Sequence, residues 1–221
     1  MPPDDLFDAI RSDDARRVRD LLAADPSLAS ARSEDGISAV LTARYNDADA
    51  ALATLLAAAP ELDVFDAAAI GDAATVRTRL DADPSLVMGR SADGYTPLHL
   101  AAFFGGLAAA RLLLDRGAAI NEPSTNLISV TPLHSALAGR RADVVHLLVD
   151  SGADVNARQA AGQAPLHYAA ENGDEDLAEL LLDAGADPSL RDGDEALPAD
   201  VARAAGHADL SVRLAELAAD R

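Results

Sequence analysis

The hydrophobic residues of this chain recur in short blocks that return at a nearly constant distance. Prolines at positions 97, 132, 165 and 198 each open an apolar block, and the steps between them are 35, 33 and 33 residues. Blocks of Leu and Val that begin at 112, 147 and 180 each run through Asp into a Gly-Ala pair. Thr before Pro favours a helix start and Gly favours a helix end, so each period predicts a turn and two short antiparallel helices. Such a unit buries its apolar face only when copies stack.

The first ninety residues carry a longer repeat. Phe7 matches Phe65 and Asp25 matches Asp83, both at an offset of 58 residues, which marks a duplicated pair of units. We therefore predict a single domain over 1–221 that contains seven helix pairs, of which the first and the last act as caps. The units are expected to start near residues 4, 35, 62, 93, 128, 161 and 194.

Composition then excludes several classes of protein. The chain has 37 acidic and 18 basic residues, a net charge of −19, and no Cys. Without Cys there is no disulfide, thiol catalysis or Cys-based zinc site, and a cytoplasmic location is expected. The apolar runs are too short for a membrane span and the N-terminus is acidic, so we expect neither membrane insertion nor export. The acidity argues against nucleic acid and predicts a protein partner with a basic surface.

Candidate chemistry is sparse. His99, His134 and His167 recur at one phase of the repeat, but side chains on successive units stand too far apart to share one metal ion. The acidic turn 192–195 lacks the alternating ligands of a calcium loop, and neither a nucleophile elbow nor a Gly-rich phosphate loop occurs. We therefore predict no catalytic residue, no cofactor and no metal site, and hence no enzyme.

The segment Thr-Pro-Leu-His-Leu-Ala-Ala from Thr96, followed by Gly105 and by the Leu block that ends at Gly117-Ala118, resembles the ankyrin repeat. The units at 131 and 164 match closely, the C-terminal unit loosely and the first three weakly. The resemblance implies an all-α solenoid of about seven helix-turn-helix units with short β-hairpin fingers. It also implies that each repeat His ties adjacent hairpins by hydrogen bonds, and that a partner protein binds the concave surface of fingers and inner helices.

The positions that the ankyrin pattern leaves free are the candidate partner contacts. They are Tyr45, Arg90, Asp93, Tyr95, Phe103, Phe104, Leu127, Ile128, Arg158, Gln163, Glu171 and Asn172. Tyr45, Tyr95, Phe103 and Phe104 are the candidate aromatic anchors, because buried aromatics dominate many interfaces. In the alternative, Tyr95 and Phe103 pack against neighbouring units. Tyr168 replaces a repeat Leu and is expected to be partly buried.

Two departures from the repeat leave alternatives open. The link from Asn121 to Val130 is two residues longer than its counterparts, and its Leu127 and Ile128 either cover the neighbouring unit or contact the partner. Residues 171–195 hold ten carboxylates against one Arg, which indicates either a solvated outer face or a contact surface.

Three functions are compatible with these patterns. A protein-binding module is favoured. A small-ligand or ion sensor, or an enzyme with a site between repeats, would need convergent polar groups, and a self-assembling spacer would need an apolar end. The last helix is amphipathic with a polar face, so we expect a monomer.

Overall fold

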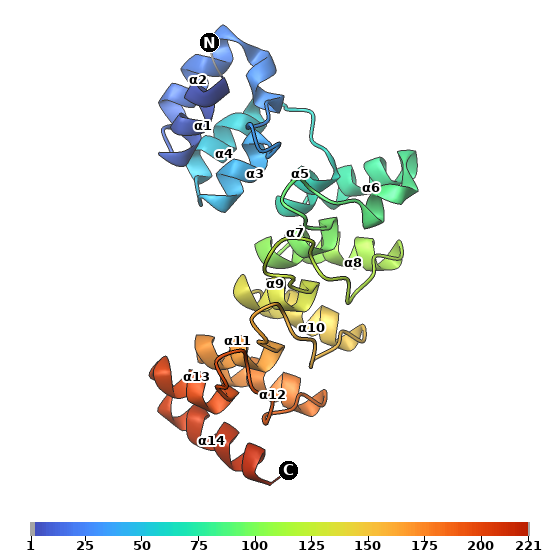
Figure 1. Ribbon diagram of the computed structural model, residues 1–221. Coiled ribbons are helices and arrows are strands. Elements are labelled where there is room, and N and C mark those ends of the chain that lie inside the picture. The colour runs from blue at the N-terminus through green and yellow to red at the C-terminus, as the bar shows by residue number, and fades with distance from the viewer. Residues whose placement is uncertain (1–2, 221) are drawn as a thin grey trace.

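The computed structural model describes residues 3–220, in which helices follow one another as seven antiparallel pairs (Figure 1). We number the pairs as units one to seven. The α-helices are α1 (Pro3–Arg11), α2 (Ala15–Ala24), α3 (Ala39–Tyr45), α4 (Asp49–Ala57), α5 (Val64–Ala69), α6 (Ala73–Ala82), α7 (Pro97–Phe104), α8 (Leu107–Asp115), α9 (Pro132–Ala138), α10 (Ala142–Asp150), α11 (Pro165–Asn172), α12 (Glu175–Asp183), α13 (Pro198–Ala204) and α14 (Ala208–Ala219). Two short 3-10 helices, η1 (Pro26–Ser30) and η2 (Pro84–Met88), follow α2 and α6. None of these helices has both the length and the apolar character that a membrane crossing requires.

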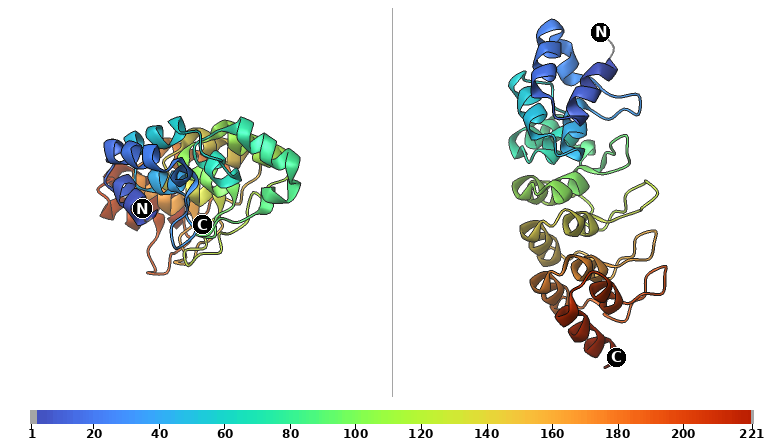
Figure 2. Two further views of the ribbon diagram at one scale, coloured as in Figure 1. Left: turned by 90° about the horizontal axis from the view of Figure 1, so that it is seen from above. Right: turned by 90° about the vertical axis from the view of Figure 1, so that its left-hand side faces the viewer.

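The first helices of the units stack into an inner row and the second helices into an outer row. The array curves, and the inner row lies on its concave side, at the left of Figure 1. Loops between units project along one edge as fingers (Figure 2). Among residues 3–220 there is no β-strand, and one isolated antiparallel bridge joins Arg32 to Ser38. The all-α prediction is confirmed, and the β-hairpin character of the fingers stays a prediction.

The inner helices begin and end at the residues that the repeat pattern indicates. Thr96 caps α7 by accepting a hydrogen bond from the amide of His99, and Pro97 occupies the first turn, where no amide proton is needed. Gly105 ends α7 in the left-handed region at φ +84°. Gly139 ends α9 differently, with φ −76°, and an added Cβ at this position would lie 2.0 Å from the carbonyl oxygen of Phe103 in unit four.

The buried apolar residues form two clusters that meet at α3. The smaller cluster joins α1 to α4 and includes Leu6, Phe7 and Leu55. The larger one runs from Leu41 on α3 through all the later units to Leu214 on α14. In the outer row α4 and α6 share at most marginal contact, as do α12 and α14, whereas the other neighbouring outer helices pack together. The single-domain boundary 1–221 stays a prediction.

Polar contacts cross the junction between units two and three. Arg32 pairs with Asp63 at 2.5 Å, and the hydroxyl of Ser38, at the start of α3, donates to the carboxylate of Asp66 on α5. Asp66 is only 3% exposed. Burial, and then the negative charge of Asp63, raises the pKa of Asp66 to about 6. A buried carboxylate therefore lies at the place where the two clusters meet.

Candidate functional site

A cleft of about 270 Å³ opens on the concave face between the fingers and the inner helices of units four to six. Its rim is formed by exposed or half-buried side chains and its floor by buried ones. The lining residues are Tyr45, Tyr95, His99, Leu100, Phe103, Ile128, Val130, His134, Ser135, Ala138 and Tyr168. Four of the predicted contacts, Tyr45, Tyr95, Phe103 and Ile128, are among them.

The cleft exists because unit five carries small residues where its neighbours carry large ones. The residue after the repeat His is Leu100 in unit four, Ser135 in unit five and Tyr168 in unit six. Three residues further on, unit four has Phe103 and unit five has Ala138. The missing side-chain volume in unit five leaves a hollow between the aromatic residues of units four and six.

Tyr45 reaches the cleft from unit two across the intervening unit. Its hydroxyl donates to Asp93 Oδ2 at 2.6 Å, and its ring centre lies 5.6 Å from that of Phe104. Phe104 in turn meets Phe103 edge to face at 5.0 Å. Burial and the Asp93 carboxylate together raise the pKa of Tyr45, so its hydroxyl remains protonated. These contacts hold one wall of the cleft in place before any ligand arrives.

The repeat histidines tie neighbouring units together, as the resemblance implies. His99 Nε2 lies 2.9 Å from the carbonyl oxygen of Val130, and His134 Nε2 lies 3.1 Å from that of Gln163. His167 makes the same kind of contact with the following unit. Burial lowers the pKa of both His99 and His134 to about 4, so these rings are neutral near pH 7. The expected hydrogen bonds from these three histidines to the following units are confirmed.

The finger arginines, including the candidate contacts Arg90 and Arg158, form hydrogen bonds within the structure, and their contact with a partner stays a prediction. Each finger Arg donates to the carbonyl oxygen four residues ahead, which closes the turn. The pairs are Arg32–Gly36 at 2.9 Å, Arg90–Gly94 at 3.2 Å, Arg158–Gly162 at 3.0 Å and Arg191–Glu195 at 2.6 Å. Arg90 also bonds Glu122 and the carbonyl of Pro123, and Arg158 the carbonyl of Arg191, so both clamp the next finger.

Two further candidate contacts near the cleft, Phe104 and Leu127, differ in how exposed their side chains are. Phe104 is 9% exposed and belongs to the larger core cluster, because Tyr45 and Arg44 cover its ring. It is therefore a buried support of the cleft and not a surface anchor. Leu127 is 98% exposed at the tip of the long finger, so it does not cover the neighbouring unit. Ile128 lines the cleft, and its carbonyl accepts a hydrogen bond from Ala160 in the next finger.

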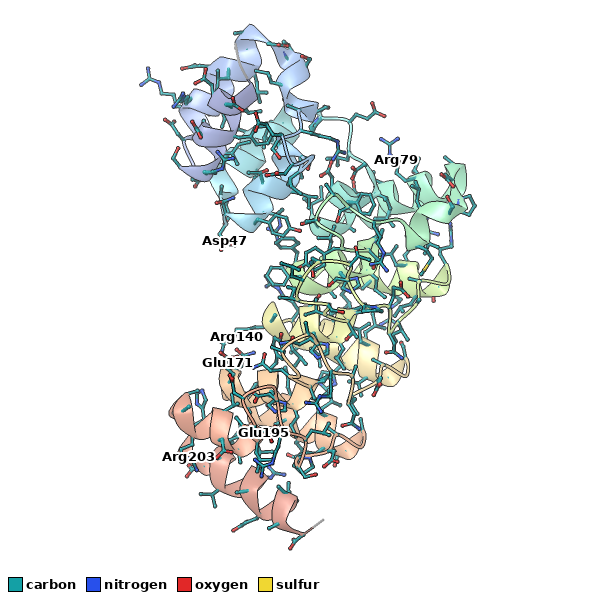
Figure 3. The ribbon with its side chains drawn as sticks, in the orientation of Figure 1. Asp47, Arg79, Arg140, Glu171, Glu195 and Arg203 are labelled. Atoms are coloured by element: carbon teal, nitrogen blue, oxygen red, sulfur yellow. The ribbon has the colours of Figure 1, made fainter. Side chains whose placement is uncertain are left out.

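The remaining expected contacts lie outside the cleft. Gln163 accepts from the side chain of Gln159 at 3.0 Å within its own finger. Asn172 donates to the carbonyl of Leu137 at 3.1 Å and so joins units five and six. The side chain of Glu171 is exposed, and Figure 3 shows it beside Arg140 on the concave side. Part of the acidic stretch 171–195 thus faces the concave side and part belongs to the outer helix α12.

Sequence reasoning missed Tyr168 and Ser135 as members of the site. Tyr168 lies 5.5 Å from His134, ring centre to ring centre, and forms the wall opposite Phe103. The signal was present, because both residues depart from Leu at the position after the repeat His. Among residues 3–220 no group of three or more His, Asp or Glu side chains could hold a metal ion.

Comparison with known proteins defines the class. Residues 64–159 and 123–192 match the family described as ankyrin repeats (3 copies), which together cover more than half of the chain. The chain belongs to the ankyrin-repeat family. Ankyrin repeats are in general modules that bind other proteins, and the family is typically non-catalytic.

Three curated relatives share the repeats. The chain is 42% identical over 100 residues to the rat ankyrin repeat and SAM domain-containing protein 6, covering 45% of this chain and 11% of that one. It is 38% identical over 81 residues to the serine/threonine-protein kinase VIK of Arabidopsis thaliana, covering 37% and 18%. It is 48% identical over 58 residues to the human neurogenic locus notch homolog protein 4, covering 26% and 3%. The chain thus spans less than a fifth of each of these relatives.

Proposed function

We propose that this protein is a non-catalytic interaction module that holds a partner protein on its concave face, with the aromatic cleft as the anchoring point. One observation carries the proposal. The chain has three Tyr and four Phe, and four of these seven side chains line a single cleft. Aromatic side chains on a concave surface are typical energetic anchors of interfaces. The contacts we assign to the partner are Tyr45, Tyr95, Phe103 and Ile128 on the rim, with Leu127 and Glu171 beside them.

The charge of the chain supports a second part of the proposal. With a net charge of −19, the protein is expected to attract a partner whose surface is basic overall, and to bind as a monomer in the cytoplasm without nucleic acid. Association with such a partner should slow as ionic strength rises to about 0.15 M, where the Debye length is about 8 Å. An association rate that is independent of salt would contradict this part alone.

The experiment begins with selection of displayed random peptides on the full chain. Selected peptides are then titrated against Phe103→Ala, which truncates a rim residue that is 37% exposed, so that folding should be little affected. Removal of an interface anchor often costs about 2 kcal/mol, or roughly thirtyfold in affinity. A second variant, Ala138→Phe, should abolish binding by filling the cleft.

Val212→Ala on α14 is the matched control, because Val212 is an exposed apolar residue far from the cleft in the last unit. Its affinity for the same peptides should equal that of the unmodified chain. The proposal fails if no peptide is enriched, or if the selected peptides bind Phe103→Ala and Ala138→Phe as tightly as the unmodified chain. Circular dichroism of each variant establishes that it is folded.

A further inference from the structure

The floor of the cleft contains a serine hydroxyl group. Ser135 is 5% exposed and lines the cleft, and its Oγ is not among the fully buried unpartnered atoms of residues 3–220, so it lies within reach of the cleft. The two histidines beside it are already engaged through both ring nitrogens, as is the hydroxyl of Tyr45. A serine hydroxyl can both donate and accept a hydrogen bond, so it can pair with a polar group of a ligand that enters the cleft. The polar group that the cleft offers to a ligand is therefore the Ser135 hydroxyl, which can act as donor or acceptor.

The size of the cleft suits one aromatic side chain. Small-molecule sites usually measure about 300–1,000 Å³, while an apolar cavity of about 150 Å³ accepts a benzene ring. At about 270 Å³ the cleft is large enough for a substituted ring and small for a drug-sized ligand. Phe103 and Tyr168 flank this space with aromatic faces and edges, which favour another ring at offset or edge-to-face geometry.

Two arginines that do not line the cleft, Arg44 and Arg141, contact the neighbouring residues Phe103 and Phe104 at one of its walls. The Arg44 guanidinium lies 4.5 Å from the ring centre of Phe104, and its buried Nε has no hydrogen-bond partner among the described residues. Arg141 donates from Nε to the carbonyl of Phe103 at 3.1 Å. Burial and then the charge of Arg141 lower the pKa of Arg44. Neither Arg forms an ion pair in residues 3–220, although Asp47 and Asp49 lie in the vicinity of Arg44.

We propose that the cleft receives a tyrosine side chain from an extended segment of the partner, with its hydroxyl bonded to Ser135 Oγ and a neighbouring carboxylate of the same segment placed against Arg44 and Arg141. The inference rests on the proposed function and specifies the occupant of the same site. A tyrosine side chain has an aromatic ring that can pack against the walls of the cleft, and a hydroxyl at its tip that can pair with Ser135 Oγ at the floor. The carboxylate complements the two arginines at one of these walls.

Three small probes test the two contacts separately by NMR titration of the full chain. Hydroxyphenylpropionate carries the phenol and a carboxylate, phenylpropionate lacks the phenol hydroxyl, and tyramine replaces the carboxylate with an amine. We expect hydroxyphenylpropionate to bind about fivefold more tightly than either of the others, since each comparison removes one contact of the size of a single hydrogen bond or exposed ion pair.

Two variants assign the contacts to their residues. Ser135→Ala should abolish the preference for the phenol and keep that for the carboxylate, whereas Arg44→Gln should do the reverse. Arg111→Gln, at an exposed position on the outer helix α8, is the matched control and should change neither. Ala138→Phe should remove all binding if the probes occupy the cleft.

The proposal is overturned if tyramine or phenylpropionate binds as tightly as hydroxyphenylpropionate, or if the probes shift no resonance of the cleft. If the selected peptides lack tyrosine and still bind the Phe103→Ala variant more weakly than the unmodified chain, the inference is refuted and the proposed function stands. Failure of that selection would instead count against the proposed function itself.

Discussion

Replacement of Asp66 by Asn should stabilise the protein at neutral pH, even though Asp66 is a buried residue with a hydrogen-bond partner. Asn has nearly the same shape and its amide oxygen can still accept the hydrogen bond from Ser38, but it carries no charge. The Asp66 carboxyl has a pKa of about 6 in the folded chain, against 3.8 for an unperturbed Asp. The folded protein therefore binds a proton that the unfolded chain has released between about pH 4 and pH 6.

The sign of the effect follows from proton linkage. Where the folded state holds more protons, stability falls as pH rises, so the contribution of Asp66 is most favourable below about pH 4 and is lost by about pH 6 to 7. A shift of about two pKa units corresponds to roughly 3 kcal/mol. We expect Asp66→Asn to exceed the unmodified chain in stability by up to about 3 kcal/mol at pH 7.5, and this difference to shrink by the same amount toward pH 4.

Urea denaturation, followed by circular dichroism at a series of pH values, measures the difference. Asp20→Asn on the exposed face of α2 is the control and should give a difference within about 0.5 kcal/mol at every pH. If α1–α4 unfolds in a separate first transition, the effect should appear there, because Ser38 and Asp66 lie on opposite sides of the junction. A difference between Asp66→Asn and the unmodified chain that stays constant from pH 4 to 8 would refute the reasoning.

Three further predictions concern packing, acid sensitivity and local stability. Gly139→Ala should destabilise the fold by about 2 kcal/mol or more although the φ of Gly139 suits Ala, because an added Cβ would lie 2.0 Å from the Phe103 carbonyl oxygen. Thermal denaturation measures the loss of stability, and an unchanged stability would show that the backbone of Phe103 can move away. In the Asp66→Asn background, the free energy of unfolding should fall as pH drops from about 6.5 to 4, because the pKa values of His99 and His134 are about 4 in the folded chain and the unfolded chain therefore binds more protons in this range. Urea denaturation at the same series of pH values tests this, and a free energy of unfolding that does not change with pH would contradict it. Amides of α1–α4 should exchange hydrogen earlier than those of units four to six, because the two clusters meet only through α3; uniform protection along the chain would count against it.

The fold of this chain follows from signals that are local in the sequence. The Thr-Pro starts, the Gly ends and the 33-residue step are local signals, and each unit of a solenoid packs mainly against its neighbours in sequence. Helix positions, repeat histidines and inner and outer rows therefore follow from the linear pattern. The same pattern predicted four rim residues of the cleft, because a repeat marks the positions that its own packing leaves free.

Which of those free positions come together as a site depends on how the units stack in space. Arg90 and Arg158 close the fingers, since a guanidinium finds carbonyl oxygens at distances that depend on how the units stack. Ser135 contributes to the floor of a cleft because large side chains from units four and six lie on either side of it. Tyr45 meets a carboxylate 48 residues away, across the junction where the array turns. Such contacts depend on the rotation between units, which the local pattern of hydrophobic and polar residues does not specify.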